Sequence, residues 1–225
     1  MTVDQINAAI RSAMEYDEYR YQLENNIRIT EPYRAEGLHK ILYQCPACGK
    51  EHRMASEGTE IFCRECGKRW EMDELGVLHA KEGETEFPHI PDWYDWERQE
   101  VKREIDRGEY RLDTPVQIGL MVDYKGLYMV GDGWLTHSKD GFRLTGCKGK
   151  LNYEQKPCVS HTLNADFYWY CIGDVIGIGN RDCLYYCFPT APDGKIPPVA
   201  KARLATEELY KAAMAERRRQ PETGK

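Results

Sequence analysis

The 225-residue sequence has no apolar run long enough to cross a bilayer. Residues 1–5 lack the basic region and the apolar core of a secretory signal, so we expect a cytoplasmic protein. Also missing are the Gly-x-Ser-x-Gly motif of serine hydrolases, a glycine loop that cradles phosphate, and a paired-histidine metal motif. These absences argue against the enzyme classes that depend on those motifs.

Positive charge is also scarce. The net charge is −6, and residues 45–90 carry six Lys or Arg side chains against ten Asp or Glu. Proteins that bind nucleic acid neutralise phosphate with Lys and Arg, so we expect no nucleic-acid partner. Only the segment after Thr190 is basic, and it contains three adjacent arginines at 217–219. We interpret them as a solvated helix end, with a contact to phosphate or anionic lipid as the alternative.

The dominant motif is a pair of Cys-x-x-Cys-Gly turns. They contain Cys45, Cys48, Cys63 and Cys66, with fourteen residues between the two turns. Four thiolates at this spacing can surround one Zn²⁺ tetrahedrally, and the glycine after each second cysteine lets the backbone fold back. Iron could occupy the same four sulfurs, although zinc is the commoner ion. Unrelated buried cysteines or two disulfides are the alternatives.

Four cysteine ligands leave no coordination position for water, so this pattern predicts a structural zinc ion and not a catalytic one. The metal would replace a hydrophobic core that such a small segment cannot build. Residues 51–62 predict a hairpin with Glu57 and Gly58 at the bend, and Trp70 is expected to cover one side of the site. Residues 45–80 are therefore predicted to form a rubredoxin-like zinc ribbon.

Five further cysteines belong to no motif. They are Cys147, Cys158, Cys171, Cys183 and Cys187. In a reducing cytoplasm they are expected to be small buried apolar residues.

Helical segments flank the predicted ribbon. Residues 1–44 form an entry segment, with a helix over 2–24 that Thr2 and Gln5 cap, and a short strand over 27–30. Residues 81–111 contain a connector and a bridging helix that Asp92 begins and Gly108 ends. The tryptophans of this helix, at 93 and 96, are expected to be packing anchors, with a ligand cage as the alternative.

From residue 112 onward, short apolar runs alternate with turn residues. The expected strands are 116–124, 127–130, 134–137, 142–145, 158–163, 167–172, 175–178 and 184–188. Gly, Asn and Asp in the breaks are typical of antiparallel hairpins. A helix after Pro197 and Pro198 closes the chain, with Val199, Ala202, Ala205, Leu209, Ala212 and Ala213 facing inward.

The predicted class is therefore α+β. Residues 112–219 are expected to form an antiparallel pleckstrin-homology-like barrel or sandwich closed by the C-terminal helix. A plain β-sandwich with a trailing helix is the alternative. Residues 220–225 are expected to be a disordered tail.

Several segments resemble the C-terminal region of bacterial 1-acylglycerol-3-phosphate or lysophospholipid acyltransferase-like proteins. The segments that carry this resemblance are Tyr-Asp-Glu-Tyr at 16–19, Arg-Ala-Glu-Gly-Leu-His at 34–39, Leu-Tyr-Gln-Cys-Pro at 42–46, and Gly-Glu-Thr-Glu-Phe-Pro-His-Ile-Pro-Asp-Trp-Tyr at 83–94. The resemblance covers most of residues 16–110 and is looser over 166–210. It implies that this chain is the ribbon and β-rich tail without the acyltransferase domain.

The catalytic motifs of those acyltransferases are not matched in a usable way. Their His-x4-Asp motif has one counterpart, His161 and Asp166, which lie on a predicted strand and its turn. Their downstream Glu-Gly-Thr-Arg motif has only the segment Glu-Gly-Thr-Glu at 57–60, which is upstream and carries Glu60 where the phosphate-binding arginine should be. We therefore do not transfer the active site to this chain.

Three functions follow as hypotheses. The first is a non-catalytic zinc-binding accessory module for a phospholipid-synthesis acyltransferase, with that domain or another protein as its partner. A lipid or the inner face of the membrane is a further candidate partner. The second hypothesis is an acyltransferase fragment with a cryptic site at His161 and Asp166. The third is a nucleic-acid-binding zinc ribbon, which the acidic charge argues against.

Overall fold

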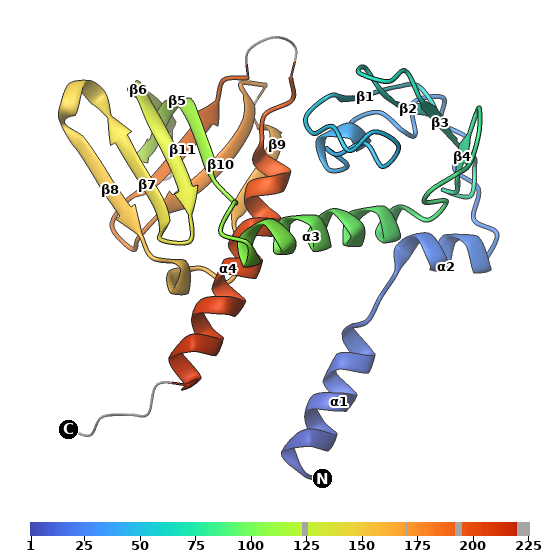
Figure 1. Cartoon of the computed structure of the whole chain (residues 1–225), viewed down its shortest axis with the longest axis horizontal. Coiled ribbons are helices and arrows are strands. Elements are labelled where there is room, and N and C mark those ends of the chain that lie inside the picture. The colour runs from blue at the N-terminus through green and yellow to red at the C-terminus, as the bar shows by residue number, and fades with distance from the viewer. Residues whose placement is uncertain (123–125, 170, 192–194, 220–225) are drawn as a thin grey trace.

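The computed structural model describes residues 1–122, 126–169, 171–191 and 195–219. Within these residues the chain forms four α-helices and two antiparallel sheets, so the predicted α+β class is confirmed. Helix α3, Ile90–Asp106, runs beneath the small sheet and toward the large one (Figure 1). Helix α1, Val3–Met14, and the end of helix α4, Val199–Arg219, extend to the same side of the molecule. Helices long and apolar enough to cross a bilayer are absent from the described part of the chain.

The N-terminal segment contains two helices instead of the single predicted one. Helix α1 spans Val3–Met14 and helix α2 spans Glu18–Glu24. The predicted capping box is confirmed, because Gln5 N donates to Thr2 Oγ1 at 3.3 Å and Thr2 N donates to Gln5 Oε1 at 2.9 Å. Helix α1 buries none of its residues and projects away from the rest of the chain (Figure 1).

The helix breaks at residues 15–17 because Asp17 begins a new one. Its Oδ1 accepts a hydrogen bond from Arg20 N at 3.0 Å, and its Oδ2 accepts from His89 Nε2 at 2.6 Å. Residues 27–30, predicted as a strand, belong to neither sheet. Ile29 N instead makes a single bond to Glu74 O at 2.8 Å.

The small sheet has the strand order β1-β2-β3-β4. Its strands are β1 Met54–Glu57, β2 Glu60–Cys63, β3 Arg69–Met72 and β4 Leu78–Ala80, and the short 3-10 helix η1 Leu38–Lys40 precedes them. The predicted hairpin is present with its turn at Gly58 and Thr59, because Glu57 pairs with Glu60.

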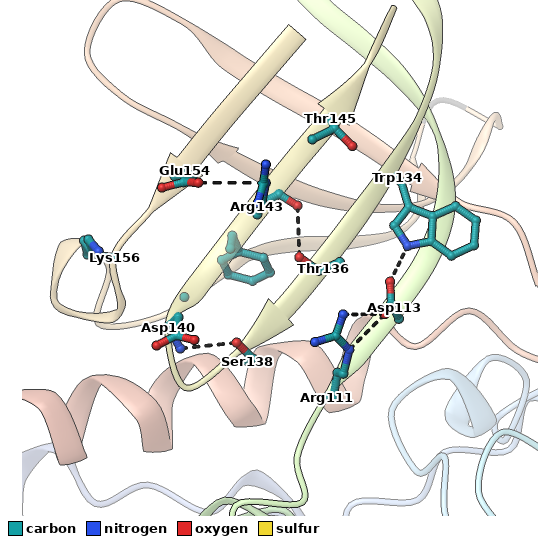
Figure 2. A pocket seen from close by; sticks show the side chains of 12 residues that line it. Arg111, Asp113, Trp134, Thr136, Ser138, Asp140, Arg143, Thr145, Glu154 and Lys156 are labelled. Carbon is teal, nitrogen blue, oxygen red and sulfur yellow. Dashed lines mark hydrogen bonds and ion pairs between the residues drawn. The ribbon is translucent and has the colours of Figure 1, made fainter. Parts of the chain in front are cut away.

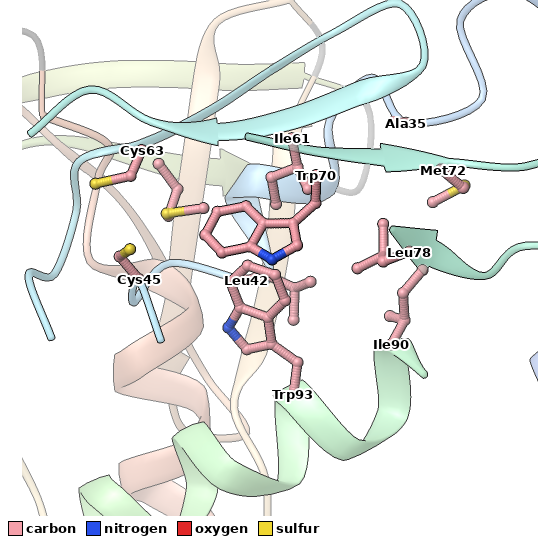
Figure 3. Packing of buried hydrophobic residues seen from close by; sticks show 11 residues of the cluster. Ala35, Leu42, Cys45, Ile61, Cys63, Trp70, Met72, Leu78, Ile90 and Trp93 are labelled. Atoms are coloured by element: carbon pink, nitrogen blue, oxygen red, sulfur yellow. The ribbon is translucent and has the colours of Figure 1, made fainter. Parts of the chain in front are cut away.

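The small sheet and helix α3 share one hydrophobic core (Figure 3). Trp70 of β3 and Trp93 of α3 are both fully buried, and their ring centroids lie 5.1 Å apart in an edge-on arrangement. Such pairs add about 0.5–1.5 kcal/mol to the free energy gained by burying their area. Trp96 is partly buried against Phe87, so both predicted tryptophan anchors pack as side chains of this core.

Helix α3 spans Ile90–Asp106, and its N-cap lies three residues earlier than predicted. Its N-cap is His89 and not Asp92, and Pro91 stands in the first turn, where its missing N–H costs nothing. The predicted stop at Gly108 is confirmed by its φ of +71°, a left-handed conformation that glycine adopts without strain.

The large sheet has seven strands in the order β8-β7-β6-β5-β11-β10-β9. Its strands are β5 Leu112–Val122, β6 Gly126–Ser138, β7 Gly141–Gly146, β8 Leu151–Gln155, β9 Asn164–Trp169, β10 Gly173–Gly179 and β11 Leu184–Pro189. The short 3-10 helices η2 Cys147–Gly149 and η3 Pro157–Val159 flank β8. Tyr124, the predicted end of one strand, Tyr170 inside another, the turn residue Lys125 and the tail 220–225 lie outside the described residues.

Strand predictions for the large sheet were wrong in four places. The strand predicted over 167–172 is β9, which begins three residues earlier and ends at Trp169, with a turn at 171–172. Strand β8 was not predicted, and residues 158–163 instead contain the end of η3 and an irregular segment. The predicted strands 127–130 and 134–137 are one continuous strand, β6. Its glycines do not form a turn: Gly131, at φ +146°, lies where the pairing with β5 shifts register, and Gly133 packs so closely that a Cβ would lie 2.5 Å from Ile118 Cδ1.

The large sheet curls around its own core without closing into a barrel. Among the described strands, β8 and β9 remain its two edges, so the sheet does not close on itself, and a second sheet of a sandwich is absent there. A side chain spans part of the opening, because Gly179 N of β10 donates to Gln155 Oε1 of β8 at 3.1 Å.

Helix α4, Val199–Arg219, begins directly after Pro197 and Pro198, as predicted. Val199 and Ala202 pack into the large-sheet core, while Ala205 and Leu209 pack with α3 residues in a separate cluster. Ala212, predicted to face inward, is exposed because this end of the helix extends beyond its packing partners. The C-terminal half is therefore more solvated than its periodicity predicted.

Helices α3 and α4 join the two sheets. Lys201 Nζ of α4 bridges Glu51 of the small-sheet segment and Glu104 of α3, with both contacts at 2.8 Å. A second ion pair joins the two helices, because Arg98 of α3 donates to Glu207 of α4 at 2.6 Å. Lys40 forms a third bridge, to buried Asp174 of β10, at 2.6 Å. Partly buried ion pairs with defined geometry fix orientation more than they add stability.

We predict that stability falls in mild acid because His137 of β6 cannot readily be protonated. Its ring stacks on Phe142, and its Nδ1 lies 2.9 Å from Tyr110 Oη. Burial lowers the pKa of His137 to about 3, whereas an unfolded histidine titrates near about 6.5. The unfolded chain therefore binds the extra proton as the pH falls below that value. Between roughly pH 7.5 and 5.5 the loss is about 1.4 kcal/mol.

Urea unfolding at several pH values measures this loss against His137→Gln, which keeps a group able to bond Tyr110. The free energy of unfolding of the variant should depend less steeply on pH between about pH 7.5 and 5.5. Equal pH slopes for the two proteins would contradict the assignment.

Candidate metal centre

The sulfurs of Cys45, Cys48, Cys63 and Cys66 lie together, all within 4.8 Å of one another. Two of the distances, Cys45 Sγ to Cys66 Sγ and Cys48 Sγ to Cys63 Sγ, are 3.8 Å. Four sulfurs at about 2.3 Å from a tetrahedral zinc ion would stand about 3.8 Å apart. A disulfide would instead require about 2.05 Å. The predicted grouping is confirmed, and its geometry is compatible with a metal ion.

Both turns have the same backbone geometry. Cys45 N donates to Lys50 O at 3.0 Å, and Cys63 N donates to Lys68 O at 2.9 Å. In each turn the glycine N–H donates to the carbonyl of the first cysteine, at 2.8 Å for Gly49 and 2.9 Å for Gly67. Both glycines have positive φ, +71° and +80°. The repeated Cys-x-x-Cys-Gly pattern thus produces two equivalent loops that point their sulfurs at one position.

The four ligands divide into a buried pair and an exposed pair. Cys45 and Cys63 are buried, and burial raises the pKa of both thiols, although backbone N–H groups of each turn act against it. Cys48 and Cys66 are exposed at the rim. Burial also acts to raise the pKa of Cys66, but hydrogen bonds led by the Lys68 N–H outweigh it and lower that pKa. A dication would favour the thiolate at all four positions.

Helix α3 holds the first turn in place through two side chains one helical turn apart. Trp93 Nε1 donates to Gln44 O at 3.0 Å, and Glu97 Oε1 accepts from Gln44 N at 2.7 Å. The Tyr43 N–H also donates to Glu97. Glu97 is fully buried, and burial raises its pKa well above the usual range. The residue before the first ligand is therefore clamped at both its N–H and its C=O.

Glu97 was missed by the sequence analysis, because a glutamate in a charged helix ordinarily faces solvent. Its only signal was its position: it lies four residues after Trp93 and four before Val101, on the face that those apolar residues predicted to be buried. The apolar periodicity of α3 predicts which face of the helix is buried, but a charged side chain gives no sign that it lies on that face and accepts from the Gln44 backbone.

The other candidate catalytic residues are not brought together. His161 is exposed and its ring contacts Tyr210, while Asp166 is exposed on β9 and accepts from Phe167 N at 2.7 Å. No hydrogen bond or ion pair connects the two. Glu60 is committed to Arg69 and Lys81, which lower the pKa of its carboxyl, with Lys81 the larger cause.

The remaining cysteines are all free, as are the four candidate ligands, so the disulfide alternative is wrong. Of the five, only Cys187 is fully buried. Cys147 and Cys183 are partly buried, and Cys158 and Cys171 are exposed. The prediction that all five are buried is therefore wrong for four of them, because they lie in turns at the rim of the large sheet.

Fold and site together define an α+β protein with a cluster of four cysteines that could hold a metal ion. Comparisons with family models, curated proteins and solved structures find no match to the chain.

We predict that Cys63→Ser abolishes stoichiometric metal binding and destabilises the small sheet. A serine hydroxyl is a poor zinc ligand, and a structural zinc site contributes folding free energy directly. Metal content by elemental analysis and the unfolding midpoint are the measurements. Cys187→Ser, a buried cysteine of the large sheet, is the control and should retain the metal. Full metal content in Cys63→Ser would contradict the site.

Gly67→Ala should weaken metal binding through backbone strain alone. A Cβ at Gly67 would meet nothing within 4 Å, but the left-handed conformation costs an L-residue about 1–2 kcal/mol. Gly149→Ala is a matched control with the same open surroundings and a φ of +83°, away from the sulfurs. Competition with a chromophoric chelator should show weaker zinc affinity for Gly67→Ala only. Equal effects of both changes would refute a metal-specific role.

Glu97→Ala should cost about 1–3 kcal/mol, because it leaves the buried N–H groups of the 43–44 segment without an acceptor. Glu97→Gln keeps an oxygen acceptor and is neutral, as burial favours, so it should cost less. Urea unfolding measures both, with the partly exposed Glu100→Ala on the same helix as the control. A Glu97→Ala protein as stable as wild type would show that the clamp is unimportant.

Proposed function

We propose that the chain is a non-catalytic interaction module built around a structural zinc ion. The observation that supports this most strongly is the closed set of four cysteine ligands at Cys45, Cys48, Cys63 and Cys66. Four thiolates suit Zn²⁺ and leave no position for a substrate or a reactive water. The bound ion would supply folding free energy at this site, and the chain's own residues would fix its surroundings.

The proposed role of the ribbon is to position α3. The backbone that leads into the first cysteine turn of the ribbon is held by Trp93 and Glu97 of α3, and the core of the ribbon includes Trp70 packed on Trp93. Because α3 also packs on α4, order at the metal site extends to the contact between the two sheets. A partner that binds across both sheets would therefore meet a surface of fixed shape.

We further propose that the partner is a lipid acyltransferase domain of the family that the sequence resembles. The resemblance that motivates this proposal covers most of residues 16–110, which include the ribbon and all of α3. We also propose a pleckstrin-homology-like relationship for the large sheet, which its seven antiparallel strands followed by a helix favour. A lipid surface is the second proposed contact, through the basic end of α4 at 217–219.

The isolated chain should not transfer acyl groups from acyl-CoA or acyl carrier protein to lysophosphatidate. A general base would need His161 oriented by Asp166, but His161 contacts Tyr210 and Asp166 accepts from Phe167 N. Product formation by the zinc-loaded chain is the measurement, with His161→Ala as the comparison. Turnover that disappears in His161→Ala would overturn the non-catalytic proposal and establish the cryptic site.

The partner is tested by titrating the zinc-loaded chain into a purified lysophosphatidate acyltransferase domain in a calorimeter. Saturable binding is expected. Binding that is absent, while the chain contains zinc and is folded, would remove the acyltransferase proposal and leave the structural zinc site intact.

A further inference from the structure

The outer face of strands β5–β8 forms a polar pocket of about 650 Å³ (Figure 2). This volume is within the range of sites that bind small molecules. Alternation along the strands sends Leu135 and Leu144 into the core and leaves polar side chains outside. Asp113, Thr136, Arg143 and Glu154 consequently form one row across four strands, because each is paired with the next in the sheet register.

An exposed tryptophan stands at the edge of this row. Trp134 on β6 is 47% exposed and lines the pocket. Its Nε1 donates to Asp113 Oδ1, and Asp113 Oδ2 in turn accepts from Arg111 Nε at 2.9 Å. The indole is thus held in one orientation by a carboxylate that is itself held by a guanidinium. An aromatic ring that is fixed but uncovered loses little side-chain entropy when a ligand stacks on it.

The charges around the pocket balance. Three cations and three carboxylates line it, and Arg111 pairs with Asp113 at 2.8 Å while Arg143 lies 3.8 Å from Glu154. Hydrogen bonds from Trp134 and Arg111 lower the pKa of the Asp113 carboxyl, which keeps it an acceptor. A phosphate or a nucleic-acid strand would need an excess of positive charge, and the pocket has none.

From this combination we infer that the pocket binds a neutral sugar. One pyranose ring stacks on Trp134, and other hydroxyl groups of the sugar bond to Arg143 and Glu154. The negative face of an indole attracts the partly positive C–H groups of a sugar ring. Paired arginine and carboxylate side chains offer donors and acceptors together, which suits hydroxyl groups that act as both. The hydroxyls of Thr136 and Thr145 extend the same chemistry across the sheet. The sugar can be a free oligosaccharide or the headgroup of a glycolipid.

Calorimetric titration of the full chain with neutral disaccharides and oligosaccharides of glucose, galactose, mannose and N-acetylglucosamine tests this inference. Binding to vesicles that contain a neutral glycosyl-diacylglycerol is the second arm, and it distinguishes a lipid headgroup from a soluble sugar. Inorganic phosphate and a single-stranded oligonucleotide are the anionic comparisons. Saturable binding to a sugar in either arm is expected, without binding to the anions.

Trp134→Ala should weaken that binding at least about tenfold, because one stacked aromatic ring contributes on this scale. Tyr128→Ala is the matched control, because Tyr128 is also an exposed aromatic residue of β6, at 60% exposure, and lies outside the pocket. Trp134→Phe, which keeps a ring but loses the bond to Asp113, should fall between them. Thermal unfolding confirms that each variant is folded.

Three results would overturn the inference. The first is a folded wild-type chain that binds no sugar in either arm. The second is sugar binding that Trp134→Ala leaves unchanged, and the third is a preference for the anionic probes.

Discussion

The convergence of four cysteine sulfurs on one position is the constraint on which the rest of the structure depends. The strands of the small sheet are only three or four residues long, and the hydrophobic core that they share with α3 includes the sulfur-bearing side chains of Cys45 and Cys63. A metal ion bound by Cys45, Cys48, Cys63 and Cys66 would connect its two loops and fix their separation. Fixing the two loops would also fix the position of the residues that contact them, including the start of helix α3.

Helix α3 transmits this order to the rest of the chain. On one side Trp93 and Glu97 bind the backbone before the first ligand, and on the other Val101 packs against α4. Lys201 then bridges the ribbon segment and α3 from its place on α4. The two sheets are therefore connected through two helices and a small set of partly buried charges. Helix α1, by contrast, buries none of its residues.

The grouping of the four cysteines could be predicted from the sequence because its information is local. Two short motifs name the ligands, and the glycine after each pair fixes the loop. The start of α4 after Pro198 and the end of α3 at Gly108 are local in the same sense. The role of Glu97 could not be predicted, because it depends on which backbone groups the folded chain places opposite its carboxyl.

The wrong predictions for the large sheet also concern contacts between distant parts of the chain. Gly131 and Gly133 were expected to form a turn, but long-range pairing with β5 keeps β6 extended, and the glycines allow close packing there. Strand β8 has little apolar content, since Glu154 faces the pocket and Gln155 is buried by its bond to β10. The pocket itself joins residues of four strands, and only the sheet register brings them together.

Hydrogen exchange of the whole chain before and after removal of the metal with a chelator tests the central claim most directly. The account predicts that protection is lost in β1–β4 and in the first turns of α3, where the clamp on Gln44 lies, while β10 and β11 remain protected. A metal-free chain that keeps full protection in the small sheet and at the start of α3 would contradict it.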